Sequence, residues 1–523
     1  MTKPHSRERP DLDYRATVGA CVARAAALFG DRDFIVLPDR RMTFAECERW
    51  SGVLARQLLA AGIGKGSRVG IFYTYGCDFV IAWLASLRIG ALVMPFSTLA
   101  KPAELGAMLR LGDVQLLLAP EVLLGRALRP FVDQAVPGLD VVTAGVLMAP
   151  QQPFLRDVWF SRRGADGAEW TGVTSIERGL VTEEVLRAAQ DAVVPADLAQ
   201  VTFTSGSAAH PKGVVHSHGA VVRNSSPEAT LFAARSVGLD DDVRSVFCAF
   251  PFFWVGGSLT LGQALQLGWT VCCLERFEPA AALDLIESER VDRVWAWPSL
   301  VQAMRTDPTY EGRDTAYLDG VLRRPAPPAE GGVVRHRGMS ETMGNWFGIE
   351  VKVVDPETGL EIPDGTEGEL CVRGFAALQG YYKQEREDVF DREGWLHTGD
   401  RVVRVDGVVQ FVGRYTEMIK SQGANVSPRE LEVLLESYDE VRHAVVVGLP
   451  HAEQEEQVVA VVVPAPGRDI DVDGLLERVR GSVSSYKVPT RVEVVSRDDD
   501  IPWLATGKPD KRALRARFVA SSS

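Results

Sequence analysis

The alternation of strand-like and helix-like segments constrains the fold of this chain more than any other feature. Residues 68–73 (RVGIFY) and 91–96 (ALVMPF) have the short apolar runs of buried strands, and residues 78–90 (DFVIAWLASLRIG) between them are long enough for a helix. The same order recurs within residues 269–299. A helix between successive strands predicts a parallel sheet. Residues 144–197 break the alternation, and we expect a poorly ordered excursion between two subdomains there.

The composition fits a globular protein with more than one domain. The chain has 523 residues, of which 46% are hydrophobic and 24% charged, so it can bury a large core. Its net charge of −13 argues against nucleic acid or an anionic membrane as the main partner. The apolar run of residues 79–96 contains Arg88, Gly90 and Pro95, so we interpret it as a buried helix and strand and expect no transmembrane segment.

The N-terminus and the cysteines indicate the compartment. Residues 1–16 (MTKPHSRERPDLDYRA) are charged and lack an apolar stretch, so we do not expect them to be a secretory signal. The seven cysteines are scattered, without a CxxC pair or the histidine spacing of a zinc site, and their odd number suits reduced thiols. We therefore expect a cytoplasmic protein without a structural metal. The sequence leaves the oligomeric state open.

A loop suited to phosphate binding follows a strand-like segment near the middle of the chain. Residues 201–203 (VTF) have the bias of a strand end, and residues 204–213 (TSGSAAHPKG) break every periodic pattern. Hydroxyls, accessible backbone N–H groups and the ammonium of Lys212 are what a polyphosphate requires. A Walker P-loop is excluded because no Ser or Thr stands at the metal position. Taken alone, the segment fits an ordinary surface loop equally well.

The pattern T-S-G-S…P-K-G resembles the nucleotide loop of the adenylate-forming superfamily, which includes acyl-CoA and aryl-CoA synthetases, firefly luciferase and the adenylation domains of peptide synthetases. Ala208 and Ala209 stand where Thr and Gly are common. The resemblance continues, in the family's order, through residues 42–47 (MTFAEC), 394–400 (GWLHTGD) and 506–508 (TGK). The chain is most similar in these motifs to fatty-acid or aryl-acid CoA ligases.

The resemblance implies an α/β fold in two parts. A large N-terminal domain, residues 1–415, would contain two αβ-layered sheet subdomains and a small β-barrel-like subdomain, and would hold the acyl and ATP sites. A small mobile α+β C-terminal domain, residues 416–523, would follow, with the hinge near Thr416. Within it, we expect Ser427 to cap a helix over residues 428–438 (PRELEVLLESY).

The resemblance also assigns roles at the nucleotide site. Lys212 and nearby hydroxyls would hold the β- and γ-phosphates, and Glu341 would bind Mg²⁺. Lys508 would neutralise charge between the carboxylate and the α-phosphate. We thus expect catalytic roles for Lys508, Glu341 and Lys212. Asp400 and Arg414 would bind the ribose. The full nucleotide-binding set is Thr204, Ser205, Gly206, Ser207, Lys212, Ser340, Asp400, Arg414 and Lys508.

The region of residues 318–354 departs most from the family pattern. It is shorter than the pattern on both sides of residues 337–342 (RGMSET), and Arg337 replaces the aromatic residue that would stack on adenine. Either residues are missing from this segment or the adenine and acyl pockets are altered. The sequence does not decide between these two explanations.

Aromatic residues indicate the class of acid. Residues 249–257 (AFPFFWVGG) resemble the family's segment beside the acyl pocket, with Phe253, Trp254 and Gly256 as acyl-binding residues. Trp254 stands where His is frequent. We expect an apolar acid, fatty or aryl, rather than acetate or an amino acid, because large aromatic side chains occur on the segments that should border the acyl site: Phe252, Phe253, Trp254, Trp295 and Trp297.

Together these assignments predict an ATP-dependent acid–thiol ligase. A carboxylic acid and MgATP would give acyl-AMP and pyrophosphate, and coenzyme A would take the acyl group through a tunnel lined by Lys420 and Gly423. Rotation about Thr416 would remove Lys508 and bring Gly423 to the same site. Three alternatives stay open: loading of a carrier-protein phosphopantetheine thiol, a luciferase-like oxygenase, and a nucleotide- or acyl-binding homologue with impaired catalysis.

Overall fold

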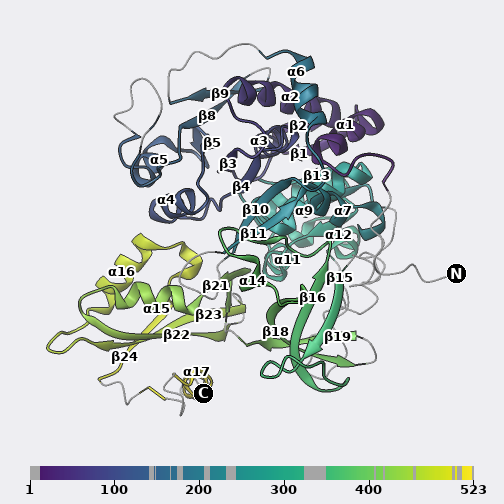
Figure 1. The fold of residues 1–523 in the computed structure, drawn as a ribbon. Coiled ribbons are helices and arrows are strands. Elements are labelled where there is room, and N and C mark those ends of the chain that lie inside the picture. Colours follow the sequence, from purple (N-terminus) through teal and green to yellow (C-terminus); the bar gives the residue numbers. More distant parts are fainter. Residues whose placement is uncertain are drawn as a thin grey trace. The chain divides into compact units, whose positions relative to one another are not determined.

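The computed structural model divides the chain into two compact units (Figure 1). The large unit comprises Met1–Thr98, Met108–Thr202 and Gly213–Tyr415, and the small unit comprises Leu99–Ala107, Phe203–Lys212 and Thr416–Ser523. A pivot at Thr416 stays a prediction. The structure describes residues 12–139, 147, 149–164, 167–173, 181–204, 212–230, 243–322, 349–405, 408–415, 418–451, 455–496, 501–502 and 509–520.

The segments expected to be helical form helices. Cys77–Arg88 (α3) and Pro279–Ser288 (α10) each follow one strand and precede another, as the alternation predicts. In the described part of the chain, each helix is too short or too polar to span a lipid bilayer. The other α-helices of the described residues are α1 (Val18–Phe29), α2 (Phe44–Ala60), α4 (Pro102–Leu111), α5 (Arg129–Ala135), α6 (Glu183–Asp191), α7 (His218–Asn224), α9 (Val255–Leu267), α11 (Pro298–Arg305), α12 (Thr315–Val321), α14 (Arg386–Val389), α15 (Pro428–Glu436), α16 (Val472–Ser482) and α17 (Lys511–Ala520).

The largest sheet has eight strands in the order β17-β11-β10-β4-β3-β5-β8-β9. The five strands from β10 to β8 run parallel, which confirms the predicted parallel sheet. Every residue of β4 and β5 is buried, as expected for strands that are covered on both faces. The strands are β17 (Gly380–Tyr381), β11 (Lys212–Ser217), β10 (Leu198–Thr204), β4 (Leu92–Pro95), β3 (Arg68–Ile71), β5 (Leu116–Pro120), β8 (Asp157–Gly164) and β9 (Gly167–Gly172).

The poorly ordered excursion expected in residues 144–197 is wrong for much of its length. Strand β8 pairs parallel with β5, and β9 pairs antiparallel with β8, so this region extends the large sheet by a hairpin. Trp159 of β8 is buried, and its Nε1 donates to Asp157 Oδ2 over 2.8 Å. The helix α6 follows. Polar residues and two prolines hid these elements from the sequence pattern.

A second sheet has five strands in the order β14-β12-β13-β1-β2. Its strands are parallel except for β2, which returns antiparallel beside β1. At the end of β2, Thr43 caps α2 by accepting from Glu46 N, and the Glu46 side chain accepts from Thr43 N. The strands are β14 (Arg293–Trp295), β12 (Ser245–Cys248), β13 (Thr270–Cys272), β1 (Asp33–Leu37) and β2 (Arg40–Thr43). A short hairpin is formed by β6 (Val122–Leu123) and β7 (Arg126–Ala127).

Helix α3 lies in the core of the large unit and carries a buried charge in its last turn. Arg88 is only 2% exposed. Its guanidinium donates to Gln190 Oε1 over 2.6 Å and to Ser51 Oγ over 2.8 Å. It also donates to both the carbonyl and the carboxylate of Glu48, each over 2.6 Å. The buried charge is tolerated because its N–H groups find acceptors.

Where the resemblance implied a small β-barrel-like subdomain, the described residues form a four-stranded antiparallel sheet in the order β15-β16-β18-β19. The register shifts between Glu369 and Cys371 and again between Arg401 and Val402. These irregularities flank the segment that carries the predicted ribose-binding aspartate. The strands are β15 (Ile349–Val354), β16 (Glu367–Gly374), β18 (Leu396–Val405) and β19 (Val408–Arg414).

The small unit is built on the sheet β21-β20-β23-β22, with β24 paired to β23. Valine-rich strands β22 and β23 are buried through their middles and pack into two apolar clusters. The predicted helix is confirmed, because Ser427 accepts from Glu430 N and Pro428 begins α15. The strands are β20 (Ile419–Ser421), β21 (Ala424–Val426), β22 (Val441–His451), β23 (Glu455–Pro464) and β24 (Arg491–Val494). The mixed α/β architecture confirms the predicted fold class.

Candidate functional site

The predicted site residues divide into two groups. The structure describes the side chains of Lys212, Asp400, Phe253, Trp254, Lys420 and the positions of Gly256 and Gly423. It describes the strand positions of Thr204 and Arg414. The remaining assignments lie outside the described residues and stay predictions: Ser205, Gly206, Ser207, Arg337, Ser340, Glu341, Thr416 and Lys508.

The predicted phosphate loop connects two neighbouring strands of the large sheet. Strand β10 ends at Thr204, and β11 begins at Lys212. The two strands stand next to each other in the sheet order. Lys212 is half-buried at the start of β11. The strand that we expected before the loop is therefore present.

A network of backbone hydrogen bonds holds the corner that carries Asp400. Gly399 has a φ of 71°, a left-handed conformation that favours glycine. Gly399 N donates to Glu369 Oε1 over 2.9 Å, and the Gly399 carbonyl accepts from Tyr415 N over 2.8 Å. Thr398 Oγ1 donates to the Leu370 carbonyl over 2.8 Å and accepts from Asp400 N over 3.1 Å. The backbone around Asp400 is thus fixed from both sides.

Asp400 and Arg414 lie at paired positions of the four-stranded sheet. Asp400 of β18 is the register partner of Arg414 of β19. The pairing of β18 with β19 therefore places the backbone positions of these two residues opposite each other, and their assignment to the ribose stays a prediction.

Aromatic side chains gather around the segment predicted to border the acyl group. The ring centroids of Phe250 and Trp297 lie 4.9 Å apart, and those of Trp254 and Trp297 lie 6.5 Å apart. Phe253 packs against Trp254 at 5.5 Å. Of the predicted cluster, Trp295 instead contacts Trp269, at 5.8 Å.

Two residues that contact this aromatic group, Phe250 and Tyr75, were missed by the sequence analysis. Phe250 contacts Trp297 at 4.9 Å, and the Tyr75 hydroxyl donates to the Ala249 carbonyl over 2.7 Å. The ring of Tyr75 also contacts Phe252, at 5.3 Å. Phe250 lay inside the quoted aromatic segment and could have been found there. Tyr75 lies far away in the sequence, so no local pattern could have revealed it.

The two glycines at the start of α9 differ in the space around them. A Cβ at Gly256 would lie 3.3 Å from Phe250 Cγ, whereas a Cβ at Gly257 would lie 2.3 Å from the Pro251 carbonyl oxygen. The first neighbour is a side chain and the second is backbone. Gly257 is therefore required by the close approach of the chain to itself, and Gly256 is not.

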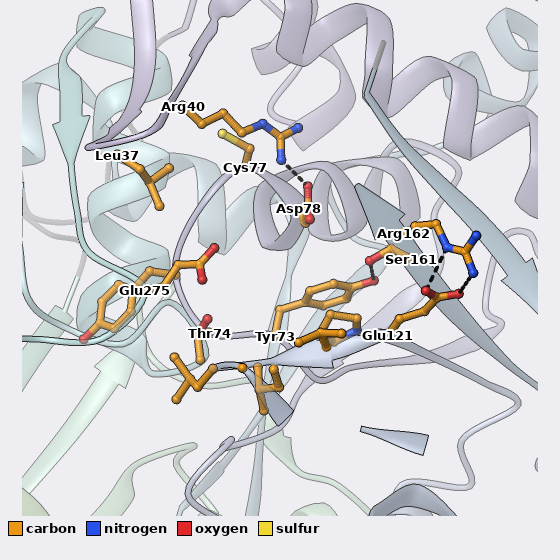
Figure 2. A pocket seen from close by; sticks show the side chains of 16 residues that line it. Leu37, Arg40, Tyr73, Thr74, Cys77, Asp78, Glu121, Ser161, Arg162 and Glu275 are labelled. Atoms are coloured by element: carbon orange, nitrogen blue, oxygen red, sulfur yellow. Dashed lines mark hydrogen bonds and ion pairs between the residues drawn. The ribbon is translucent and has the colours of Figure 1, made fainter. Parts of the chain in front are cut away.

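The large unit also contains a cavity of about 380 Å³ that no predicted site residue lines (Figure 2). Residues that follow β3 and β5 contribute to its wall, as do Ser161 and Arg162 within β8 and Glu275 after β13. Two ion pairs lie at its rim, Arg40 with Asp78 at 2.8 Å and Arg162 with Glu121 at 2.9 Å. The cavity is polar, and carboxyl ends of parallel strands are where α/β sheets bind ligands.

The predicted thiol-side residues lie on a tight hairpin of the small unit. Ser421 pairs with Ala424, so Gln422 and Gly423 form a two-residue turn between β20 and β21. Both have positive φ, 52° and 77°, which is typical of a type I′ turn and explains the glycine. Lys420 is exposed just before the turn, and its backbone N donates to Glu456 Oε2 over 2.8 Å.

Similarity to known proteins covers nearly the whole chain. Residues 22–327 match a family described as AMP-binding enzyme, and residues 430–508 match the AMP-binding enzyme C-terminal domain. YngI of Bacillus subtilis, named as an acyl-CoA synthetase, is 27% identical over 96% of this chain and 97% of its own length. The rice 4-coumarate–CoA ligase 2 (Oryza sativa subsp. japonica) is 28% identical over 98% of this chain and 94% of its own.

A solved structure supports the fold in the same way. The amide bond synthetase McbA from Marinactinospora thermotolerans is 25% identical and superposes with a TM-score of 0.70 over 95% of this chain and 99% of its own. This similarity extends over both the large sheets and the C-terminal region. The architecture described above is therefore that of a known enzyme fold.

Proposed function

The chain belongs to the AMP-binding enzyme family, and from this premise we propose that it activates an apolar carboxylic acid as acyl-AMP and transfers the acyl group to coenzyme A. Membership confirms the resemblance to the adenylate-forming superfamily and makes the chain an enzyme of that group. The observation that carries the proposal is the full-length similarity to proteins named as acyl-CoA synthetase and 4-coumarate–CoA ligase.

The geometry around Asp400 supports a nucleotide-binding role for the four-stranded sheet. The hydrogen bonds of Glu369 and Thr398 fix the backbone on both sides of Asp400. An aspartate held in this way can accept hydrogen bonds from two neighbouring hydroxyls without reorganisation, which suits a ribose. We assign Asp400 and Arg414 to the ribose on this basis.

The aromatic wall supports the choice of substrate. Trp297 contacts both Phe250 and Trp254 in the large unit, and Phe253 extends the group through Trp254. A wall of aromatic rings favours an acyl chain or an aryl ring over a short polar acid. We propose a fatty or aryl acid as substrate.

The remaining assignments complete the proposed reaction. Lys212 and Lys508 balance phosphate and carboxylate charge during adenylation, and Gly423 admits the thiol arm. Bound Mg²⁺ would supply charge neutralisation at the phosphates, and its assigned ligand Glu341 lies outside the described residues. ATP, Mg²⁺ and coenzyme A are thus proposed participants, and the cytoplasm stays the predicted location.

ATP–pyrophosphate exchange across a panel of carboxylic acids tests the proposal. We expect exchange with medium-chain or aromatic acids and none with acetate or amino acids. Lys508→Ala should abolish exchange but largely spare thioester formation from supplied acyl-AMP, because the lysine acts in the first half-reaction. Exchange with acetate alone would overturn the substrate class, and no exchange with any acid would favour an impaired binding homologue.

Mass spectrometry of the acyl product distinguishes the acceptors. We expect acyl transfer to coenzyme A in preference to a phosphopantetheine-bearing carrier protein. An amine is a further acceptor to include, because the structurally similar McbA is an amide bond synthetase. Uptake of O₂ or light emission with the active acid would instead indicate a luciferase-like oxygenase.

A further inference from the structure

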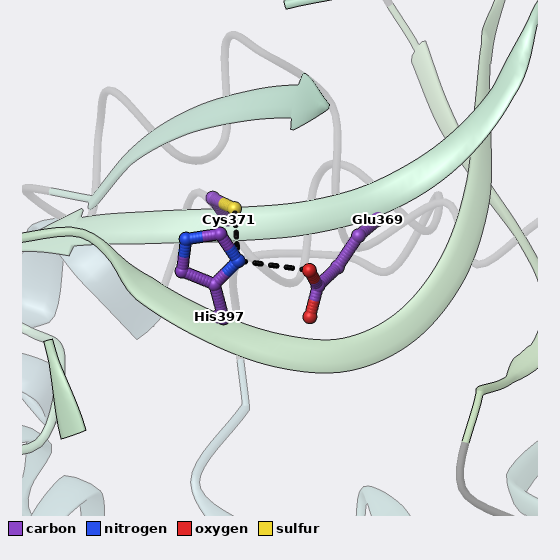
Figure 3. A group of neighbouring side chains, drawn as sticks. All are labelled: Glu369, Cys371 and His397. Carbon is purple, nitrogen blue, oxygen red and sulfur yellow. Dashed lines mark hydrogen bonds and ion pairs between the residues drawn. The ribbon is translucent and has the colours of Figure 1, made fainter. Parts of the chain in front are cut away.

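Three side chains of different chemistry meet on the four-stranded sheet, close to the corner of Asp400 (Figure 3). Glu369 and Cys371 are two residues apart on β16, and Cys371 is the register partner of His397 on β18. Alternate residues of a strand, and directly opposite residues of an antiparallel pair, project to the same face. The sheet therefore places a carboxylate, a thiol and an imidazole close together on one face.

The distances suit a tetrahedral metal ion. Cys371 Sγ lies 3.5 Å from His397 Nδ1, and His397 Nδ1 lies 2.8 Å from Glu369 Oε2. Zinc binds sulfur at about 2.3 Å and imidazole nitrogen at about 2.0 Å, which places tetrahedral S and N ligands roughly 3.5 Å apart. The sulfur and nitrogen already have this spacing. The carboxylate oxygen has to move roughly half an ångström away from the imidazole, and all three ligand atoms lie within 4.8 Å of one another.

Neighbouring residues orient Glu369 and His397, as residues around the ligands do in metal sites. Glu369 Oε1 accepts from Gly399 N over 2.9 Å, which leaves Oε2 directed at His397. His397 Nε2 lies 3.8 Å from Asp391 Oδ2. Asp391 is itself fixed, because its Oδ1 accepts from the backbone N–H groups of Glu393 and Trp395. A carboxylate behind a ligating histidine is a frequent arrangement.

The charge around the cluster favours a dication. The carboxylates of Glu369, Asp391 and Glu393 lie in and around it, and one ammonium, Lys352, lies 3.7 Å from Asp391 and 3.8 Å from Glu393. Three negative groups and one positive group leave two negative charges uncompensated among these four. The side chain of His397 is 40% exposed and that of Glu369 is 13% exposed, so an ion can reach the buried thiol from solvent.

We propose that Glu369, Cys371 and His397 form a binding site for a zinc ion, with water as the fourth ligand. The mixed carboxylate, imidazole and thiolate set selects zinc over magnesium, because magnesium prefers oxygen ligands alone. On binding, the Cys371 S–H bond breaks, a Zn–S bond forms and the proton passes to solvent. None of the three ligands is Glu341, the residue assigned to Mg²⁺.

Metal binding by the untagged full-length chain tests this proposal without any assay of activity. Zinc titration against a chelating indicator should give one ion per chain, and Co²⁺ should give the near-ultraviolet charge-transfer band of a thiolate ligand. Cys371→Ser should abolish that band and weaken zinc binding at least tenfold. His397→Asn should weaken zinc binding to a similar extent.

His443→Asn is the matched control for the histidine. His443 Nδ1 lies 2.9 Å from Glu436 Oε1, so this residue also belongs to a histidine–carboxylate pair, but it stands on β22 of the small unit. Its removal should leave zinc binding and the cobalt band unchanged. Absence of stoichiometric zinc binding, or a cobalt band that survives Cys371→Ser, overturns the proposal. If Cys371→Ser does not fold, a wild-type cobalt spectrum without a thiolate band overturns it equally.

Discussion

The parallel strands β3, β4 and β5 and the antiparallel sheet β15-β16-β18-β19 belong to the same large unit but differ in how fully their side chains are buried. Nearly all residues of the three parallel strands are buried. In β16 and β18, buried residues are interspersed with half-buried and exposed ones. Parallel strands are covered on both faces, whereas an antiparallel sheet can leave one face to solvent.

This difference predicts which substitutions change the stability of the protein and which change its activity. The polar groups near the parallel strands form hydrogen bonds with one another inside the unit. The guanidinium of Arg88, for example, donates to Gln190, Ser51 and Glu48. The polar groups of the antiparallel sheet instead fix the backbone around Asp400 or stand at its accessible face. Substitutions in the first region should therefore change the free energy of unfolding, and those in the second should change activity.

The largest effect is expected at Arg88. Arg88→Ala removes a buried guanidinium and leaves its acceptors without their donor, so the free energy of unfolding should fall by about 4 kcal/mol. Chemical denaturation, followed by probes of the large unit, measures this loss. The folded fraction should retain near-normal specific activity in pyrophosphate exchange. A large drop in the specific activity of the folded fraction would break the comparison.

Acid should weaken the same large unit through His218. This side chain is buried, its Nδ1 accepts from Val18 N over 3.3 Å, and burial lowers its pKa from 6.5 to about 4. The unfolded chain then binds a proton that the folded chain does not. The stability is present above pH 6.5 and is lost as the pH falls towards 4.

The expected loss from His218 is about 3 kcal/mol across that interval. Denaturation at a series of pH values measures it, with His218→Gln as the comparison, because glutamine does not titrate. The variant should show a shallower dependence of unfolding free energy on pH. Equal slopes in the two proteins would show that other groups cause the acid sensitivity.

Asp400→Ala should act on the reaction rather than on the fold. Loss of two hydrogen bonds from a ribose to a carboxylate costs about 3 kcal/mol, roughly a hundredfold in kcat/KM for ATP. The thermal midpoint should change little. Asp364→Ala is the control, because Asp364 is exposed near the same sheet and pairs with Arg404 at 2.5 Å. Similar losses of activity in both variants would argue against a specific role.

The smallest effects are expected from a matched pair of threonines. Thr398→Val removes the hydroxyl that bonds Leu370 and Asp400, and Thr43→Ala removes the cap of α2. Each should cost about 1 kcal/mol. For Thr398→Val, we expect the cost to appear as a KM for ATP that is raised roughly fivefold. For Thr43→Ala, it should appear only in the unfolding free energy, and equal changes in KM would contradict the distinction.

The parallel core was predictable from the sequence because its signal is local. Residues 68–96 contain uninterrupted apolar runs, and helix and strand lengths alone distinguish them. Strands β8 and β9 were missed because the prolines and polar residues around them mimic a loop. Asp400 was assigned to the ribose by resemblance, whereas the bonds from Glu369 and Thr398 that hold the backbone around it depend on strand pairing, which a sequence does not display.

The cluster of Glu369, Cys371 and His397 illustrates the same limit. The sequence analysis predicted no structural metal because it searched for cysteine and histidine spacings along the chain. The i, i+2 spacing of Glu369 and Cys371 was a usable signal, since it places both on one face of a strand. His397 joins them only through the register of β16 and β18.

The difference in space around Gly256 and Gly257 limits which substitutions near the proposed acyl site are compatible with the fold. A lineage that explores other acids can replace Gly256, because a displaced Phe250 ring absorbs the added methyl group. It cannot replace Gly257 without moving the backbone at Pro251. Directed evolution of the proposed acyl site should therefore randomise Trp254 and Gly256 and hold Gly257 constant, so that most variants in the library still fold.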